Sequence, residues 1–242
     1  RPFAFKGASF NEKWNLVVRL VDEQGNCAYG VGGLAVLWSD AAVFAAHTET
    51  GGNVLQTVLL ERGLQLAQKG SWSHPLDLFE EIWPQVYAYG TEITGRKELR
   101  PTFALNALVA LDNAAWMLWA RRRGVDDFTA LLPQGGGPLL AARQGQVAAV
   151  PAVGYNMPLD QVESLVEDGV CMLKVKIGQP GDAEEMLQKD MAWLERLHRQ
   201  VGGRDCAGTK SGRVLYYLDA NGRYPGAGHL ERLLDHLEAL GA

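Results

Sequence analysis

Residues 171–178 constrain the fold of this sequence more than any other stretch, because two lysines interrupt an otherwise apolar run. Side chains on a β-strand point alternately to its two faces, and aliphatic residues at this spacing predict a strand. One face is then aliphatic, whereas the other carries Lys174 and Lys176. Two ammonium groups on one side of an internal strand are costly unless that side opens on a polar cavity. The stretch therefore predicts a pocket beside a buried strand.

A second apolar strand, at residues 213–222, also becomes polar at its end. Its alternation places Tyr217, Asp219 and Asn221 on one face. A helical stretch separates the two strands, and a strand–helix–strand unit requires parallel pairing with a right-handed crossover. The lysines and Asp219 are therefore expected at the same end of one sheet.

The composition excludes several classes of partner. The chain of 242 residues is 47% hydrophobic and 21% charged, which is ordinary for a globular protein with one or two domains. Its net charge is −5 and its basic residues are scattered apart from residues 121–123, so neither nucleic acid nor an anionic membrane surface is expected as a partner. No run approaches the roughly 18 apolar residues of a membrane span, and no signal-peptide pattern is present.

The three cysteines indicate a reducing compartment. Cys27, Cys171 and Cys206 are odd in number, far apart and form no CxxC pair, which argues against a disulfide framework or a zinc cluster. We therefore expect buried or idle thiols and a cytoplasmic location.

The first 130 residues predict a small α+β domain whose strands precede its helices. A hairpin is expected at residues 14–31, with its turn at residues 22–26. Residues 5–10 predict a loop with Lys6 as the charge at its tip. Apolar residues at helical spacing predict helices over residues 53–67, 76–87 and 103–123.

Proline and glycine in residues 131–145 predict a linker, after which the sequence pattern changes. Between residues 146 and 242 a strand is followed by a helix three times. The expected strands cover residues 147–155, 171–178 and 213–222, and the expected helices cover residues 158–167, 182–201 and 230–240. This repetition is typical of a parallel α/β barrel or a doubly wound sheet.

The polar residues at the strand ends define a candidate site. If the two polar-ended strands are neighbours, about 4.8 Å apart, their side chains reach one pocket. The candidates are Lys174, Lys176, Asp219 and Asn221, with Tyr155 from the end of the preceding strand. A lysine and Asp219 could simply form a structural ion pair, but three polar residues at matched strand ends are more than packing alone usually supplies. Two chemistries fit this arrangement.

In the first chemistry, oxygen ligands including Asp219 hold a divalent cation such as Mg²⁺. A lysine whose neutral form is favoured by a cationic neighbour then removes a proton next to a substrate carboxylate, and the cation stabilises the resulting enediolate. In the second chemistry, one lysine forms a Schiff base with a carbonyl substrate, which requires no anionic ligand.

Lys-Val-Lys-Ile-Gly at residues 174–178, followed by Leu-Asp-Ala-Asn at residues 218–221, resembles the enolase superfamily in its mandelate racemase and muconate lactonizing enzyme branches. The hairpin turn at residues 22–25 and the helix around residues 110–116 resemble parts of that family's capping domain, as does the Leu-Leu pair at residues 131–132.

The resemblance implies two domains. Residues 1–130 would form an α+β N-terminal capping domain that sets substrate specificity, joined by the linker at residues 131–145. Residues 146–242 would form the first part of a catalytic α/β domain of the TIM type, a modified β/α barrel, with only about three βα units present.

The resemblance also implies roles for the polar residues. Lys176 would be the acid/base lysine, with Lys174 beside it facing the substrate carboxylate. Asp219 would be the first of three acidic ligands of one Mg²⁺, a position that Mn²⁺ can also occupy, and Asn221 would hydrogen-bond the substrate.

Residues 5–10 resemble the family's mobile loop that closes over the substrate. Lys6 in this loop and Tyr155 at a strand end are therefore further candidates for substrate binding.

An eight-stranded barrel needs about 250 residues, far more than follow the linker here. We therefore expect the sequence to be part of a longer protein whose remainder supplies the other two metal ligands and a partner base. The expected activity is Mg²⁺-dependent removal of the α-proton of a small carboxylate substrate. It would lead to racemisation or epimerisation, to dehydration of an acid sugar, or to cycloisomerisation. The alternative is an inactive relative that serves as a binding or assembly subunit, and in either case we expect a homo-oligomer.

Overall fold

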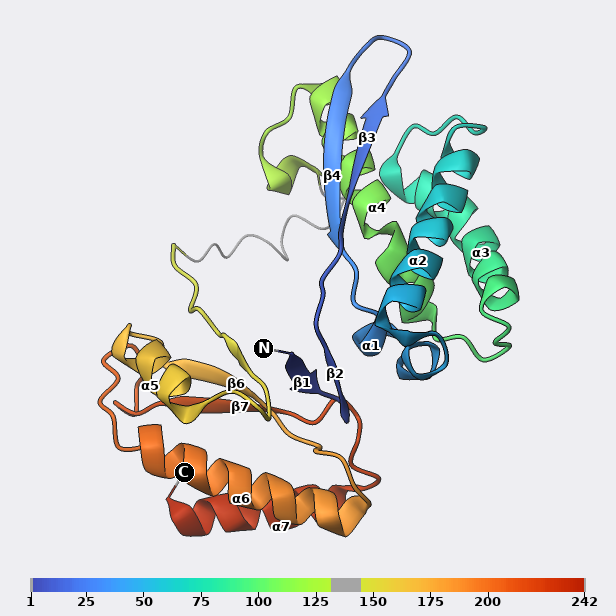
Figure 1. Ribbon diagram of the computed structural model, residues 1–242. Helices are drawn as coiled ribbons and strands as arrows, with labels where there is room; N and C mark the ends of the chain where they lie inside the picture. Colours follow the sequence, from blue (N-terminus) through green and yellow to red (C-terminus); the bar gives the residue numbers. More distant parts are fainter. Residues whose placement is uncertain (1, 132–144, 242) are drawn as a thin grey trace. The chain divides into compact units, whose positions relative to one another are not determined.

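The computed structural model describes residues 2–131 and 145–241, which form two compact units (Figure 1). One unit contains residues 12–131. The other contains residues 145–241 together with residues 2–11. The sequence placed the N-terminal segment in the capping domain, whereas in the structure it packs with the C-terminal unit. Most of the predicted linker lies outside the described residues.

The unit of residues 12–131 begins with the predicted antiparallel hairpin. Strands β3 (Asn15–Val21) and β4 (Cys27–Gly33) pair in a continuous register, with Val18 opposite Gly30. The turn is fixed by the Asp22 carboxylate, which accepts the backbone N–H groups of Gln24 at 3.0 Å and Asn26 at 2.8 Å. Such a side chain replaces missing ladder hydrogen bonds at a tight turn.

Helices cover one face of this hairpin. They are α1 (Val36–Ser39), α2 (Ala41–Ala67), α3 (Pro75–Ile93) and α4 (Pro101–Arg123), followed by the short 3-10 helix η1 (Phe128–Leu131). Helix α2 starts well before the predicted residue 53, because Asp40 caps it by accepting the N–H groups of Ala42 and Val43. The chain then kinks at Thr48, whose φ is 64°, and this kink interrupts the helical spacing that a sequence pattern detects.

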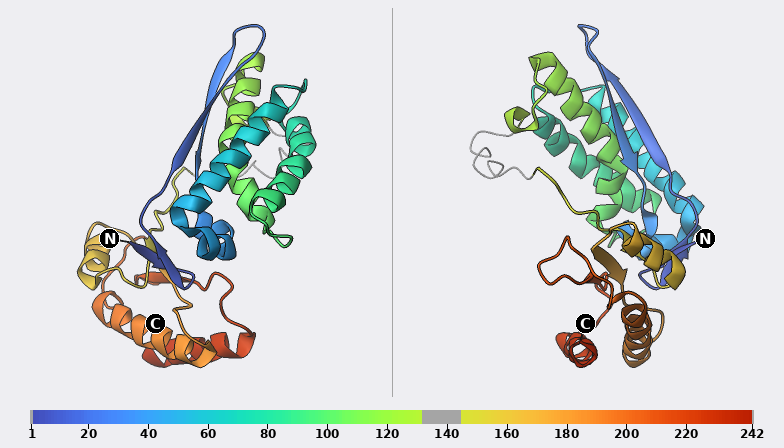
Figure 2. Two further views of the ribbon diagram at one scale, coloured as in Figure 1. Left: turned by 45° about the vertical axis from the view of Figure 1, so that its right-hand side comes forward. Right: turned by 90° about the vertical axis from the view of Figure 1, so that its left-hand side faces the viewer.

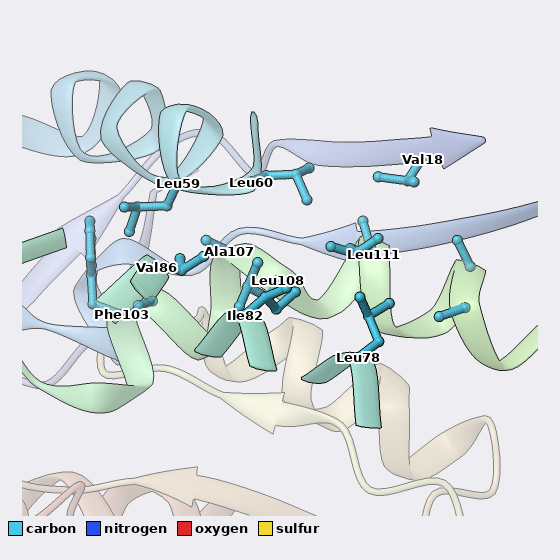
Figure 3. Close-up of a cluster of buried hydrophobic side chains, with 14 of the residues drawn as sticks. Val18, Leu59, Leu60, Leu78, Ile82, Val86, Phe103, Ala107, Leu108 and Leu111 are labelled. Atoms are coloured by element: carbon cyan, nitrogen blue, oxygen red, sulfur yellow. The ribbon is translucent and has the colours of Figure 1, made fainter. Parts of the chain in front are cut away.

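Helix α4 is the centre of this unit. Its apolar residues Phe103, Leu108 and Leu111 have no exposed surface and meet side chains of α2, α3 and the hairpin (Figure 3). The helix is long and apolar enough to cross a membrane by length and composition, which the sequence pattern had not indicated. Its burial within the unit agrees with the core helix of a folded domain.

The other unit is built on a parallel sheet with strand order β5–β6–β7. The strands are β5 (Ala152–Val153), β6 (Met172–Lys176) and β7 (Leu215–Asp219), and the helices are α5 (Leu159–Glu167), α6 (Ala183–Val201) and α7 (Ala227–Leu240). Each strand is followed by a helix, as predicted, and α6 and α7 pack side by side (Figure 2). The aliphatic face of β6 is fully buried at Leu173 and Val175.

Residues 2–11 form a small hairpin and not the loop that the sequence indicated. Strands β1 (Phe3–Phe5) and β2 (Ala8–Phe10) pair antiparallel around a two-residue turn. Both turn residues have positive φ, 54° at Lys6 and 79° at Gly7, as a tight hairpin turn of the mirror-image type requires. The Phe5 ring is buried and packs on Phe10, with ring centroids 5.9 Å apart.

The packing of β4 on α4 yields the first testable prediction. A Cβ atom at Gly30 would lie 2.1 Å from the carbonyl oxygen of Ala110 and 2.2 Å from the amide nitrogen of Ala114. Since both are backbone atoms of α4, neither can rotate away. We expect Gly30→Ala to lower the free energy of unfolding of this unit by about 3 kcal/mol in urea titrations.

Gly70→Ala is the matched control. A Cβ atom at Gly70 would meet only the Glu81 side chain, at 3.5 Å, so this variant is expected to unfold close to wild type. Equal unfolding midpoints for the two variants would contradict the close packing of β4 on α4.

Candidate active site

The ends of β6 and β7 bring three charged side chains together. Parallel pairing places Lys176 opposite Asp219 and Lys174 opposite Tyr217. The Lys176 Nζ lies 2.7 Å from Asp219 Oδ2, and the Lys174 Nζ lies 3.0 Å from the same oxygen. One carboxylate oxygen thus receives two ammonium groups at the carboxyl end of the sheet. The convergence that the sequence predicted is present.

Asn221 completes this group through a tight turn. Asn221 and Gly222 both have positive φ, 50° and 70°, and asparagine tolerates that conformation better than most residues. The turn directs the Asn221 backbone N–H to Asp219 Oδ1 at 3.0 Å, while its side-chain Oδ1 accepts from Lys176 Nζ at 2.9 Å. Both oxygens of Asp219 are therefore hydrogen-bonded. We call Lys174, Lys176, Asp219 and Asn221 the lysine–aspartate cluster.

Aromatic rings flank the two ammonium groups. The Phe5 ring centroid lies 5.0 Å from Lys176 Nζ, and the Tyr217 ring centroid lies 5.1 Å from Lys174 Nζ. The face of an aromatic ring carries negative potential, which favours a nearby cation. Lys176 is also the more enclosed of the two, with 8% of its side chain exposed against 32% for Lys174. Lys176 is thus held on several sides, whereas Lys174 is open to solvent.

The cluster keeps the Asp219 carboxylate ionised. Burial alone would raise the pKa of Asp219, but hydrogen bonds from Lys176, Lys174 and the Asn221 backbone outweigh that effect and lower the pKa from 3.8 to about 2. The group is therefore a permanent anion at neutral pH, as a ligand of a hard cation must be.

Tyr155 lies at the same sheet edge, but its hydroxyl is engaged with backbone. It donates to the Gly178 carbonyl at 2.8 Å, close to the Ile177 carbonyl at 3.1 Å, and backbone groups of Lys6 and Gly7 hydrogen-bond to it. Burial, followed by the charge of Asp190, raises the pKa of Tyr155 to about 12. Tyr155 thus joins the β1–β2 turn to the segment that follows β6.

Lys6 occupies the tip of the β1–β2 hairpin. The hairpin is attached to the parallel sheet through Asn156, whose Oδ1 accepts from Ala4 N–H at 3.3 Å and whose Nδ2 donates to the Pro2 carbonyl at 2.6 Å. The structure therefore brings the Lys6 segment to the sheet edge through backbone contacts, while a role of its side chain in substrate binding stays a prediction.

The sequence pattern missed one residue beside the site. Asp190 lies on α6 with no exposed surface, and its Oδ2 accepts from the Gly178 N–H at 2.6 Å and from the Tyr224 hydroxyl at 2.7 Å. Burial raises the pKa of Asp190 against these hydrogen bonds. A signal was available, because Asp190 stands between Leu187 and Leu194 at the spacing of the buried stripe of this helix.

The donor set fits one ligand position of a magnesium site. Mg²⁺ takes oxygen ligands and commonly uses one or two carboxylates together with water and substrate, and Asp219 supplies one anionic oxygen donor. Within residues 2–131 and 145–241, no group of three or more His, Cys, Asp or Glu side chains is placed to hold a metal ion. Asp219 thus fits a divalent cation only if further ligands come from outside the described residues.

The low pKa of Asp219 makes the stability of the protein depend on pH. A carboxyl whose pKa is lower in the folded state stabilises the fold above its ordinary pKa of 3.8, and this contribution is lost as the pH falls through about 2. We expect about 2 kcal/mol from this effect at neutral pH. The gap in unfolding free energy between wild type and Asp219→Asn should therefore shrink between pH 5 and pH 2 in urea titrations.

Asp235→Asn, at an exposed position on α7, serves as the control and should leave this pH dependence unchanged. A wild-type advantage over Asp219→Asn that stayed constant down to pH 2 would show that the lysines do not stabilise the charged carboxyl.

No protein-family model and no curated protein sequence matches this chain. Solved structures do match. The L-Ala-D/L-Glu epimerase from Bacillus subtilis is 17% identical with a TM-score of 0.58, and the match covers 100% of this chain and 55% of the epimerase. The L-talarate dehydratase from Polaromonas sp. JS666, complexed with Mg and L-glucarate, is 18% identical with a TM-score of 0.57, over 99% of this chain and 55% of the dehydratase.

A mandelate racemase/muconate lactonizing protein from Herpetosiphon aurantiacus is 14% identical with a TM-score of 0.57, over 100% of this chain and 54% of that protein. The chain thus spans about half the length of the solved structures it matches. The chain therefore shares its fold with these epimerase, dehydratase and racemase-type structures over the half of their length that it spans.

Proposed function

We propose that this chain belongs to a Mg²⁺-dependent enzyme that removes the α-proton of a small carboxylate substrate. The observation that supports this most is the position of the Lys176 amine. It is fixed 2.7 Å from Asp219 Oδ2 and 2.9 Å from Asn221 Oδ1 at the carboxyl end of a parallel sheet. In barrels of parallel strands this edge carries the active site.

Each member of the lysine–aspartate cluster has a task in this proposal. Lys176, in its neutral form, takes the proton from the α-carbon, because its amine is enclosed and held in one place. Lys174 binds the substrate carboxylate, because its side chain lies closer to solvent than that of Lys176. Asn221 places its side-chain amide beside the Lys176 amine and orients the substrate by hydrogen bonding.

Asp219 would hold the metal ion together with acidic residues outside the described part of the chain. When bound, Mg²⁺ or Mn²⁺ supplies positive charge that stabilises the enediolate formed as the proton leaves. Two observations support this assignment. Against the opposing effect of burial, hydrogen bonds from the two lysines lower the pKa of Asp219 to about 2, so it is ionised at neutral pH, and the structurally similar talarate dehydratase is a complex with Mg and L-glucarate.

The step after proton removal decides the product. Return of a proton from the opposite face gives racemisation or epimerisation, and loss of a β-hydroxyl gives dehydration. Loss of the ring oxygen of a lactone opens the ring, which is the reverse of cycloisomerisation. An epimerase and a dehydratase are both among the similar structures, so the shared first step is the part that the geometry of Lys176 supports.

Solvent exchange measures this first step directly. In D₂O with Mg²⁺, a panel of N-acyl amino acids, dipeptides and acid sugars is followed by NMR for loss of the α-hydrogen. We expect exchange with at least one member, loss of exchange with EDTA, and its return with added Mg²⁺ or Mn²⁺. Lys176→Ala should reduce the exchange rate by about 10²- to 10⁴-fold, the usual contribution of a general base.

Lys210→Ala is the matched control, because Lys210 is an exposed lysine in the turn before β7, and its exchange rate should equal that of wild type. Retention of the wild-type rate in Lys176→Ala would refute the base assignment. Exchange that survives EDTA, with borohydride trapping of substrate on the protein, would instead establish a Schiff-base lysine. Absence of α-hydrogen exchange with every member of the panel would favour a binding or assembly subunit.

A further inference from the structure

We propose that Asp190 is a positioning residue. It fixes the position of the Lys176 amine along the strand direction relative to Asp219 and Asn221. This inference rests on the proposed function for its kinetic consequence, but its structural consequence stands without it. Asp190 lies on α6 and is 0% exposed. Its hydrogen bonds described above go to Gly178 and Tyr224, and to no member of the lysine–aspartate cluster.

The first half of the argument concerns Gly178, two residues beyond Lys176. Its N–H donates to Asp190 Oδ2 at 2.6 Å, and its carbonyl accepts from the Tyr155 hydroxyl at 2.8 Å. Gly178 has a φ of 85°, which glycine adopts without cost. Both backbone polar groups of Gly178 are therefore held by side chains, one from the buried Asp190 and one from the half-buried Tyr155, so the chain is fixed in place just after Lys176.

The second half concerns the segment that follows β7. The Tyr224 hydroxyl donates to Asp190 Oδ2 at 2.7 Å, and Tyr224 lies three residues beyond Asn221. The same oxygen of Asp190 thus receives a donor from each of the two segments that carry the cluster. A shift of either strand along its axis would lengthen one of these hydrogen bonds, so the carboxylate couples the two strand ends.

A carboxylate is required for this coupling. Asp190 accepts from Gly178 N–H and Tyr224 on Oδ2, and from the Gln179 backbone at 3.4 Å and the Gln179 side chain at 3.2 Å on Oδ1. Every one of these partners is a donor, and a carboxylate is acceptor-only when ionised. An asparagine of the same shape would turn an N–H group toward one of these donors and release one of the two segments.

A purely structural role for Asp190 makes a different prediction. Loss of buried hydrogen bonds alone lowers the stability of the unit and leaves the turnover of the folded fraction unchanged. A positioning role lowers kcat in the folded enzyme while the substrate still binds, because a small displacement of the base weakens proton transfer more than it weakens binding.

The experiment compares Asp190→Asn and Tyr224→Phe with Asp182→Asn. Asp182 caps the same helix by accepting the N–H groups of Glu184 and Glu185, and asparagine caps helices nearly as well, so this variant controls for the same substitution on α6. Each protein is labelled with ¹³Cε-lysine, and the Lys176 signal is assigned by its loss in Lys176→Ala. Thermal unfolding establishes that each variant is folded.

We expect the Lys176 signal to move in Asp190→Asn and, less far, in Tyr224→Phe, and to stay in place in Asp182→Asn. For the α-proton exchange reaction, kcat should fall about 10- to 100-fold in Asp190→Asn, the cost of misplacing a catalytic group by about 1 Å, with KM nearly unchanged. If Asp190→Asn does not fold, Tyr224→Phe decides, because it removes one hydroxyl and keeps the carboxylate.

A folded Asp190→Asn, or a folded Tyr224→Phe if the former fails to fold, whose Lys176 signal matches wild type would overturn the inference. The same holds if kcat is unchanged, or if KM alone rises. A moved Lys176 signal in a protein without exchange activity would leave the coupling intact and refute only the proposed function.

Discussion

The contact of two lysine ammonium groups with one oxygen of Asp219 is the interaction on which the unit of residues 145–241 depends. Lys174 and Lys176 share one face of β6, and their charges would oppose burial of the strand without a nearby anion. The parallel register supplies that anion by placing Asp219 opposite Lys176 at 2.7 Å. The parallel register of β6 and β7 therefore also determines the charge balance of the site, and the two features constrain the sequence together.

Much of the site could be predicted from the sequence, because apolar and polar residues alternate along both strands in the way this constraint requires. Lys176, Asp219 and Asn221 follow from period-two alternation and parallel pairing, which are local rules. No partner could be assigned to Asp190 in this way, because its hydrogen-bond donors Gly178 and Tyr224 become its neighbours only after α6 packs on the sheet. The sequence reveals an acid in an apolar stripe, but not what the acid binds.

The same distinction explains the differences in the fold. Residues 5–10 contain a glycine, which a sequence pattern interprets as a loop, whereas the positive φ of both Lys6 and Gly7 makes a tight hairpin. Helix α2 extends beyond the predicted range because the Asp40 cap and the kink at Thr48 hide its first turns from helical periodicity. In both places, backbone conformation at one or two residues overrides the pattern of side chains.

The position of the site at the edge of the sheet also explains how one lysine can be exposed to solvent while its neighbour is held in a fixed position. Lys174 keeps 32% of its side chain in contact with solvent, as its proposed binding of a substrate carboxylate requires. Its neighbour Lys176 is enclosed by Phe5, Asp219 and Asn221, and the peptide just beyond it is held by Tyr155 and Asp190. Since buried hydrogen bonds are stronger and less mobile than exposed ones, rigidity comes from the layer beneath the site. The groups that are proposed to bind the substrate are thereby left accessible to solvent.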